Sequence, residues 1–354
     1  MSREGVQRAG GLAAKLAAWQ RQHGRHGLPW QGSRDPYRVW LSEIMLQQTQ
    51  VATVLDYYPR FLARFANVQV LAAAPLDDML ALWSGLGYYS RARNLHHCAH
   101  AVVAEHGGSF PRSAAALAEL PGIGRSTAAA IAAFCFGERV AILDGNVKRV
   151  LTRVLGFGDD LALAANERAL WQQAEALLPT TGIEAYTQGL MDLGATLCSA
   201  RRPQCEACPL SALCVARRDG APESYPLKTR KLKRSQRSNA LMLIGSSEQV
   251  WLVQRPHRGV WAGLWTPPLY DTLDELRALT ADWPGHGEPM PPINHALTHF
   301  DWHLQPWRQH LPARLSAARR AALEAALPEG RWFTVEQALK LGLPAPVRKL
   351  LVAA

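Results

Sequence analysis

The sequence of 354 residues has little cysteine, a modest share of charged residues and no long apolar run. Crossing a membrane takes about 18 consecutive apolar residues, and no stretch approaches that length. Residues 1–19 mix charged with apolar side chains and lack the apolar core of a secretion signal, so we expect a cytoplasmic protein. The 6 cysteines are too few for a disulfide framework in a chain of this length. With 48% hydrophobic and 19% charged residues, the chain is not mainly disordered.

Acidic residues are outnumbered, with 29 Asp and Glu against 39 Lys and Arg, which gives a net charge of +10. A positive surface of this kind suits a polyanion such as nucleic acid. The charge concentrates in residues 219–237, where Lys and Arg outnumber the acids by 6 to 2 and apolar residues are few. This composition is typical of a linker, so we predict a first domain over residues 1–218 and a second over residues 238–354.

The two predicted domains differ in hydrophobic pattern. The first is rich in Ala and Leu at helical spacing, for example over residues 52–66, 101–104 and 125–136, which predicts a mainly α domain. In the second, residues 240–244 and 250–253 are typical of short strands, and residues 317–326 predict a helix. The second domain is therefore expected to be a smaller α+β fold.

Four of the six cysteines crowd into residues 198–214 with the spacing C-x6-C-x2-C-x5-C. Thiolates at this density hold iron–sulfur clusters or zinc. A four-cysteine zinc site more often combines two C-x2-C pairs, and only one occurs here, so we predict a [4Fe-4S] cluster with zinc as the alternative. The predicted ligands are Cys198, Cys205, Cys208 and Cys214.

A glycine turn precedes one of the predicted helices. Leu-Pro-Gly-Ile-Gly, with Gly122 and Gly124, runs directly into the helical segment 125–136. Amide N–H groups of such a hairpin, together with the helix N-terminus, can bind a DNA phosphate without reading sequence. Further along, Asp144 in Leu-Asp-Gly-Asn-Val stands where a helix N-cap is expected. For an isolated Asp, capping alone would explain this position.

The hairpin, the downstream Asp and the cysteine loop, in this order, resemble the helix-hairpin-helix DNA glycosylases of the endonuclease III superfamily over about residues 10–218. The resemblance implies that Asp144 stabilises positive charge on the deoxyribose as the base departs. Bifunctional members carry a Lys two residues after the second hairpin glycine, where this chain has Ser126. Because a hydroxyl cannot form a Schiff base, we predict base removal without lyase chemistry. Lys148 is expected to contact a phosphate.

Glu43 lies in a second informative segment, residues 40–51. If the segment is one helix, Glu43, Leu46, Gln47 and Gln50 share a face. Apolar neighbours would desolvate the Glu43 carboxyl and raise its pKa, so that it carries a proton near neutral pH. A departing adenine needs such a proton on N7. An ion pair with an Arg is the ordinary alternative for this Glu.

This segment, with residues 28–30 and 85–94, resembles the adenine DNA glycosylases of the MutY type. The resemblance implies that Glu43 is the general acid and that Asn146 helps Asp144. It also implies an adenine pocket and a set of residues that contact the DNA around the opposite 8-oxoguanine. The expected pocket residues are Trp30, Leu46, Ser126 and Gln188, and the expected contacts beside the lesion are Gln48, Thr49, Leu86 and Tyr88.

Residues 238–354 resemble the Nudix-like domain that this type of enzyme appends for lesion recognition, on the motif Trp-Ala-Gly-Leu-Trp at residues 261–265. Its acids lack the tight box that holds magnesium in Nudix hydrolases, so we predict no nucleotide hydrolysis. The segment 297–300 corresponds to the loop that reaches the lesion, which makes Thr298 and His299 expected DNA contacts. The alternating pattern over residues 300–304 predicts a strand, which argues against a histidine metal site there.

Together these features predict a helix-hairpin-helix glycosylase domain with an iron–sulfur loop, followed by a smaller α+β Nudix-like domain. The predicted activity is hydrolysis of the N-glycosidic bond of adenine opposite 8-oxoguanine or guanine in double-stranded DNA, by a monomer associated with the nucleoid. Two alternatives remain open at this point. One is an endonuclease III-like pyrimidine glycosylase with lyase activity, and the other is a DNA-binding protein without catalysis.

Overall fold

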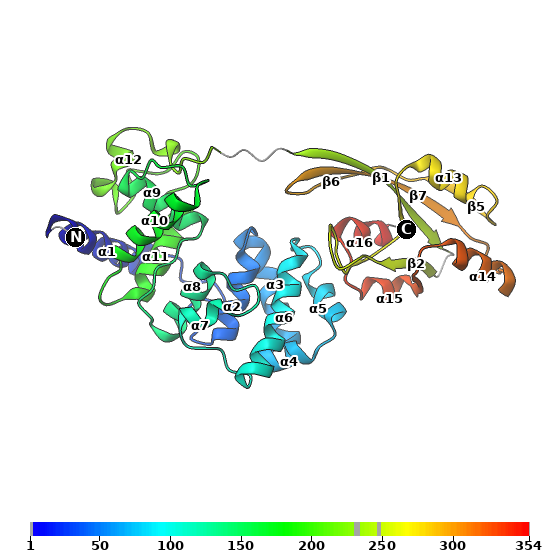
Figure 1. Ribbon diagram of the computed structural model, residues 1–354, viewed down its shortest axis with the longest axis horizontal. Coiled ribbons are helices and arrows are strands. Elements are labelled where there is room, and N and C mark those ends of the chain that lie inside the picture. The colour runs from blue at the N-terminus through cyan, green and yellow to red at the C-terminus, as the bar shows by residue number, and fades with distance from the viewer. Residues whose placement is uncertain (1–2, 230–233, 246–248, 354) are drawn as a thin grey trace. The chain divides into compact units, whose positions relative to one another are not determined.

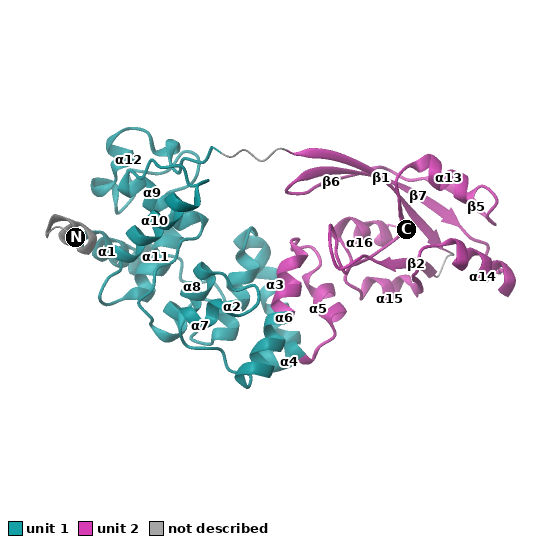
Figure 2. Ribbon diagram, in the orientation of Figure 1, with its two compact units in different colours: residues 1–72, 97–231 teal, residues 73–96, 232–354 magenta. Residues whose placement is uncertain are grey.

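The computed structural model describes residues 3–229, 234–245 and 249–353, and the chain divides into two compact units (Figures 1 and 2). Unit 1 comprises residues 1–72 and 97–231, and unit 2 comprises residues 73–96 and 232–354. None of the described helices combines the length and the apolar character that a membrane span requires.

Unit 1 is built from helices. In chain order they are α1 (Arg3–His23), α2 (Pro36–Leu46), α3 (Val51–Arg64), α4 (Val68–Ala73), the later part of α6 (Tyr89–His106), α7 (Ala114–Ala118), α8 (Arg125–Phe136), α9 (Gly145–Leu155), α10 (Ala164–Ala176), α11 (Ile183–Thr196), the 3-10 turn η1 (Ser211–Leu213), α12 (Val215–Arg218) and the 3-10 turn η2 (Pro222–Ser224). The helix predicted over residues 125–136 is confirmed as α8. The segment predicted over residues 52–66 forms α3, and residues 101–104 lie within α6.

One buried core joins the helices α1, α8, α9, α10 and α11. Leu16, Ala133, Val150, Leu170 and Leu190 represent these helices in it, each at most 2% exposed. The cysteines at 198, 208 and 214 pack against its edge. The core therefore positions the starts of α8 and α9 and the cysteine loop against the same rigid body.

The predicted glycine hairpin connects α7 to α8. Ser113 caps α7, and the chain then turns at Gly122, whose φ of +76° favours glycine. Ile123 is buried and its amide donates to the carbonyl of Leu120, while Gly124 forms the extended N-cap of α8. The turn thus places the N-terminus of α8 at the surface, as the sequence predicted.

Unit 2 combines a mixed sheet with short helices (Figure 1). Its elements are α5 (Leu76–Trp83), the start of α6, β1 (Ser235–Gly245), β2 (Gln249–Gln254), β3 (Trp265–Thr266), β4 (Leu269–Tyr270), α13 (Leu273–Thr280), β5 (His286–Pro289), β6 (Ile293–Ala296), β7 (Phe300–His310), α14 (Ala317–Ala326), β8 (Arg331–Thr334), α15 (Val335–Leu339) and α16 (Ala345–Val352). The two long strands β1 and β7 run parallel from the pair Ser235 and Phe300 to the pair Gly245 and His310, and the other pairings are antiparallel.

The predicted elements of the second domain are confirmed by the described residues. Residues 240–244 lie in β1, residues 250–253 in β2, residues 300–304 open β7, and residues 317–326 form α14. The α+β character of this domain is therefore as predicted.

The division of the chain differs in one respect from the predicted domains 1–218, 219–237 and 238–354. Residues 73–96 group by their contacts with the C-terminal fold and not with the remainder of the helical domain (Figure 2). The predicted linker contains η2 near its start, and its last residues, from Ser235, already belong to β1. Residues 230–233 of the linker lie outside the described residues.

Candidate active site

A cavity of about 980 Å³ opens in unit 1 between the end of α2, the starts of α8 and α9, and α11. It collects predicted site residues from segments that are far apart in the sequence. These are Trp30, Glu43, Leu46, Gln48, Thr49, Ser126, Asp144, Asn146 and Gln188. All the predicted catalytic residues and all the predicted adenine-pocket residues therefore line one cavity.

Glu43 is presented to this cavity by α2. Asp35 caps that helix by accepting from the Tyr37 amide at 2.9 Å, and Pro36 occupies its first turn. The carboxyl of Glu43 is enclosed by the cavity wall, and burial raises its pKa to about 8, with the negative charge of Asp144 as the second cause. Glu43 is thus protonated at neutral pH, which is the state that a general acid needs.

Asp144 caps α9, with its Oδ1 accepting from the Val147 amide at 2.7 Å. Burial raises the pKa of Asp144, whereas the amides of residues 146 and 147 and the charges of Arg149 and Lys148 oppose that rise. The capping role expected for an isolated Asp is therefore present, and the capped carboxylate also lines the cavity with Glu43. Two carboxyl groups in unlike surroundings can take unlike protonation states.

The expectation that residues 40–51 form one helix is wrong. α2 ends at Leu46, Gln48 adopts a left-handed φ of +56°, and α3 begins at Val51. The amide of Thr49 donates to the carbonyl of Leu46, which closes a turn. The polar run from Gln47 to Gln50 offers no apolar face to bury, so packing does not continue the helix. The turn instead exposes Gln48 and places Thr49 at the cavity.

Gln188 is held by a buried acid that the sequence analysis did not identify. Its Nε2 donates to Oδ1 of Asp192 at 2.9 Å, and the same carboxylate accepts from the backbone N and the Nε of Arg25. Asp192 is 0% exposed, so these donors stabilise its charge inside the protein. The spacing of four residues on one helix between Gln188 and Asp192 is the signal that could have revealed the pair.

Arg149 is a second residue of the cavity wall that the sequence analysis did not identify. Its guanidinium donates to Asn146 Oδ1 at 2.8 Å, to the Gly194 carbonyl at 2.6 Å and to the Cys198 carbonyl at 2.8 Å. These contacts connect the start of α9, the end of α11 and the first residue of the cysteine loop. Asn146 is therefore oriented by a side chain that also holds that loop.

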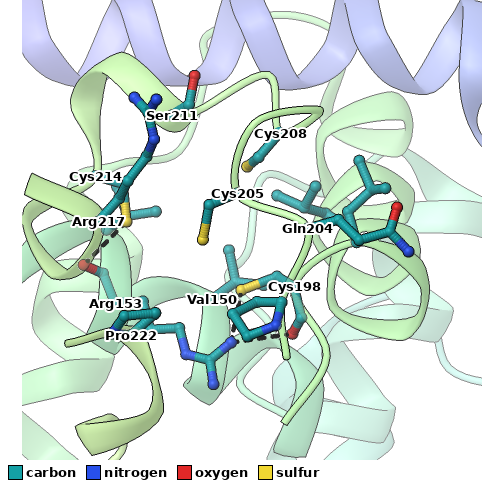
Figure 3. Close-up of a pocket in the computed structure, with 14 residues that line it drawn as sticks. Val150, Arg153, Cys198, Gln204, Cys205, Cys208, Ser211, Cys214, Arg217 and Pro222 are labelled. Carbon is teal, nitrogen blue, oxygen red and sulfur yellow. Dashed lines mark hydrogen bonds between the residues drawn. The ribbon is translucent and has the colours of Figure 1, made fainter. Parts of the chain in front are cut away.

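The four predicted cysteine ligands surround one space at the edge of unit 1 (Figure 3). Arg153 is 2% exposed and lies beneath the loop, where it donates to Cys198 Sγ at 3.3 Å and to the Ser199 carbonyl at 2.7 Å. Among the described residues, no three His, Cys, Asp or Glu side chains are spaced to hold a single metal ion. Four thiols around one space are the ligand set that an iron–sulfur cluster requires.

Other predicted contacts lie away from the cavity. In unit 1, Lys148 forms an ion pair with Glu167, with Nζ and Oε1 2.6 Å apart. In unit 2, Tyr88 is 43% exposed with a left-handed φ of +47°, whereas Leu86 is buried. Thr298 and His299 are exposed, and Thr298 Oγ1 donates to the Tyr88 hydroxyl at 3.5 Å. The structure thus brings Tyr88 and Thr298 together although 210 positions separate them.

Arg91 supports the loop that carries Tyr88. Its NH2 group donates to the carbonyls of Leu86 and Gly87 at 3.3 Å each, and its guanidinium lies over the rings of Trp83 and Tyr88. Burial lowers the pKa of Arg91 to about 10, so it remains charged at neutral pH. The left-handed backbone at Tyr88 is therefore braced from within.

Comparison with known proteins identifies the family. Residues 41–175 match the HhH-GPD superfamily of base excision DNA repair proteins, residues 198–214 match the iron–sulfur binding domain of endonuclease III, and residues 239–353 match the NUDIX domain. The chain therefore carries an endonuclease III-type iron–sulfur domain, as predicted from its cysteines.

Relatives and solved structures agree with these matches. The chain is 34% identical to the adenine DNA glycosylase of Buchnera aphidicola subsp. Schizaphis graminum, over 94% of this chain and 95% of the relative. It is 32% identical to the adenine DNA glycosylase of Homo sapiens, over 91% of this chain and 70% of the relative. A thermostable thymine-DNA glycosylase superimposes with a TM-score of 0.56 at 31% identity, over 60% of this chain and 98% of that one. Endonuclease III in a non-covalent DNA complex shares the fold, with a TM-score of 0.50 at 22% identity, over 62% of this chain and 98% of that one. The chain belongs to the adenine DNA glycosylase family, within the HhH-GPD superfamily of base excision repair enzymes.

Proposed function

We propose that this enzyme hydrolyses the N-glycosidic bond of adenine paired with 8-oxoguanine, and more slowly with guanine, in double-stranded DNA without cutting the strand. The observation that carries the proposal is the pair of carboxyl groups in the cavity. Burial raises the pKa of Glu43 to about 8. Burial also raises the pKa of Asp144, but the amides of residues 146 and 147 and the charges of Arg149 and Lys148 oppose that rise and favour the carboxylate.

The two carboxyl groups divide the chemistry. Adenine leaves poorly as an anion, so Glu43 donates a proton to N7 as the bond to the sugar breaks. The sugar then carries positive charge, which the Asp144 carboxylate stabilises across the cavity. After the base departs, the ionised Glu43 accepts a proton from the attacking water. Asn146, held by Arg149, keeps the polar wall of this site in place.

The adenine pocket is formed by Trp30, Leu46, Ser126 and Gln188. Trp30 is buried and packs edge-on against Tyr58, with ring centroids 5.4 Å apart, which fixes an aromatic wall. Because the side-chain amide NH2 of Gln188 donates to Asp192, the side-chain oxygen of Gln188 is oriented to accept from the exocyclic amino group of adenine. A flipped base is thus read by stacking and by hydrogen bonds to its edge.

The absence of lyase chemistry is supported by Ser126 and Lys148. The Ser126 hydroxyl accepts from the Leu143 amide at 3.1 Å and has no amine to attack the sugar. The Lys148 amine is paired with Glu167. Base removal therefore leaves an intact abasic strand.

The iron–sulfur cluster has a structural role in this proposal. Cys198, Cys205, Cys208 and Cys214 would hold it, and the bound cluster supplies a cross-link between segments of the loop that have little core of their own. The loop in turn receives Arg149 at the Cys198 carbonyl and Arg153 at the Ser199 carbonyl. Through these contacts the cluster stabilises the start of α9, which carries Asp144.

DNA binding is divided between the units. The amides of Gly122 and Gly124, with Lys148 at the margin, bind phosphates through the hairpin. Gln48 and Thr49 lie at the cavity and approach the lesion strand. The remaining lesion contacts come from the exposed residues Tyr88, Thr298 and His299. Leu86, expected as a further contact, is 5% exposed and supports the Tyr88 loop from below. We expect the enzyme to act as a monomer on the nucleoid.

A single-turnover assay tests this function. End-labelled duplexes carry adenine opposite 8-oxoguanine, guanine or thymine, or an oxidised pyrimidine, and each sample is divided for treatment with hot alkali. We expect breaks only after alkali and fastest for adenine opposite 8-oxoguanine. Breaks at the oxidised pyrimidine without alkali would establish the endonuclease III-like alternative, and no breaks at all would establish a binding protein without catalysis.

Two matched variants test the mechanism. Glu43→Gln should lose base release by more than about a hundredfold while DNA affinity stays within about twofold, because it removes only the proton. Glu184→Gln changes another acid at the cavity rim, where Glu184 pairs with the exposed Arg34, and should leave the rate unchanged. Equal rates for the wild-type enzyme and Glu43→Gln would refute the role of Glu43.

A further inference from the structure

The segment 73–96 is attached to the C-terminal fold by polar contacts that the proposed function does not use. Ser84 and Leu343, for example, are in contact although 259 positions separate them. The segment contains α5 and the first turns of α6, between which lies the loop that carries Tyr88. The contacts of the segment therefore determine whether the Tyr88 loop moves together with the C-terminal fold.

The first point of attachment is the carbonyl oxygen of Leu343, a residue that is 0% exposed. This oxygen accepts from Ser84 Oγ at 2.8 Å and from the Tyr89 hydroxyl at 3.0 Å. Arg348, on α16, donates from Nε to Ser84 Oγ at 3.1 Å and from NH2 to the Leu341 carbonyl at 3.4 Å. The side chains of Ser84, Tyr89 and Arg348 are half-buried and form a bracket, in which two of them donate to the Leu343 carbonyl and Arg348 holds Ser84 in place. Leaving the buried carbonyl unsatisfied would be costly.

A second point of attachment lies on α6. Arg93 NH1 donates to the Ala262 carbonyl at 2.7 Å, in the turn where Trp261 has a left-handed φ of +57°. Burial lowers the pKa of Arg93, which agrees with a guanidinium drawn out of water into this contact. On α5, Asp77 Oδ2 accepts from Trp265 Nε1 at 3.3 Å.

Apolar packing closes the space between these polar contacts. Leu80 is 0% exposed, and a Cβ added at Gly342 would lie 2.6 Å from the Leu80 Cβ. Helix α5 and the loop before α16 therefore touch with no room for a methyl group. A contact that combines several half-buried hydrogen bonds with close apolar packing behaves as part of one folded body.

We propose that Arg348 and Arg93 are positioning residues that fasten the segment 73–96 to the C-terminal fold. Tyr88 and Thr298 then keep a fixed relative position when they contact the DNA strand that contains 8-oxoguanine. The inference rests on the proposed function for its substrate, and on the contacts of unit 2 for its geometry. Thr298 donates to the Tyr88 hydroxyl only while the bracket holds both loops in register. Weakening the bracket reduces lesion discrimination and leaves the chemistry at Glu43 and Asp144 intact.

Hydrogen exchange of the full-length protein tests the attachment without any DNA. In Arg348→Ala, amides of residues 84–93 and 341–348 should exchange about tenfold faster, the loss expected for one half-buried hydrogen bond from a charged donor. Arg320→Ala is the matched control, because Arg320 lies in the same fold and pairs with Glu324. Unchanged exchange in Arg348→Ala would overturn the bracket whatever the substrate is.

Single-turnover rates then test the reading of the lesion. In Arg348→Ala and Arg93→Ala, the ratio of the rate opposite 8-oxoguanine to the rate opposite guanine should fall about tenfold, with the rate opposite guanine unchanged within about twofold. Arg348→Lys retains one donor and should recover part of the ratio. Equal loss on both duplexes, or faster exchange with an unchanged ratio, would overturn the positioning role.

A variant that changes only the packing, and removes no charge, tests the same attachment independently. Gly342→Ala inserts a methyl group against Leu80 and should lower the same ratio while all hydrogen-bonding side chains are retained. An unchanged ratio in this variant would count against rigid coupling. If the wild-type enzyme itself shows no preference for 8-oxoguanine over guanine, the proposed substrate is wrong, and the exchange experiment still decides whether the bracket exists.

Discussion

Replacing Glu43 by Gln should make the protein more stable while it abolishes catalysis. The cavity raises the pKa of Glu43 from 4.5 to about 8, with burial as the main cause and Asp144 as the second. The unfolded chain releases this proton near pH 4.5, but the folded chain retains it until about pH 8. The stability that the folded state gains from binding this proton is full below pH 4.5 and is lost as the pH rises to about 8.

The structure sets the size of this effect. Each pH unit between the two pKa values costs about 1.4 kcal/mol, so the difference between variant and wild type is about 3 kcal/mol at pH 7 and about 5 kcal/mol above pH 8. Gln has nearly the same shape and no charge at any pH, so the pH-dependent part of the difference isolates ionisation at residue 43. These magnitudes are upper values, because water in the cavity weakens the penalty.

Urea unfolding of both proteins at pH 5.5, 7 and 9 measures this difference. The stabilisation of Glu43→Gln should be smallest at pH 5.5, larger at pH 7 and largest at pH 9, because it stops growing only above pH 8. Glu184→Gln should show no comparable trend, because the Glu184 side chain is 46% exposed. A stability difference that stays constant from pH 5.5 to 9 would refute the desolvated, protonated Glu43 on which the mechanism depends.

Three further predictions follow from the site. Single-turnover excision by the wild-type enzyme should fall about tenfold per pH unit above pH 8, because only protonated Glu43 donates; a flat profile to pH 9.5 would contradict this. Arg153→Leu should reduce iron per purified chain, since buried Arg153 holds the cysteine loop, whereas Arg218→Leu, 73% exposed, should not. Arg91→Ala should slow excision about tenfold by releasing the Tyr88 loop; wild-type rates would show that the loop needs no brace.

Local patterns in the sequence predicted much of the secondary structure. α8 and α14 have the predicted bounds, and Asp144 caps α9 as predicted, because helical periodicity and capping act over a few neighbouring residues. The cysteine spacing was likewise sufficient to predict an iron–sulfur domain, since four ligands within a short loop converge with little help from the remaining chain. The catalytic assignments came from the family resemblance. For Asp144, the sequence pattern alone was compatible with helix capping or with catalysis.

The sequence by itself therefore determined the helical and α+β domains, the cysteine loop and the identity of the carboxyl groups. Tertiary structure decided how they are used. It ended α2 at Leu46, tied Gln188 to Asp192, joined Asn146 to the cysteine loop through Arg149, and grouped residues 73–96 with the C-terminal fold. Each of these depends on burial and on partners distant in the sequence. The raised pKa of Glu43 also depends on the tertiary structure, because the cavity that buries it is lined by residues 20–51 and 126–195 together.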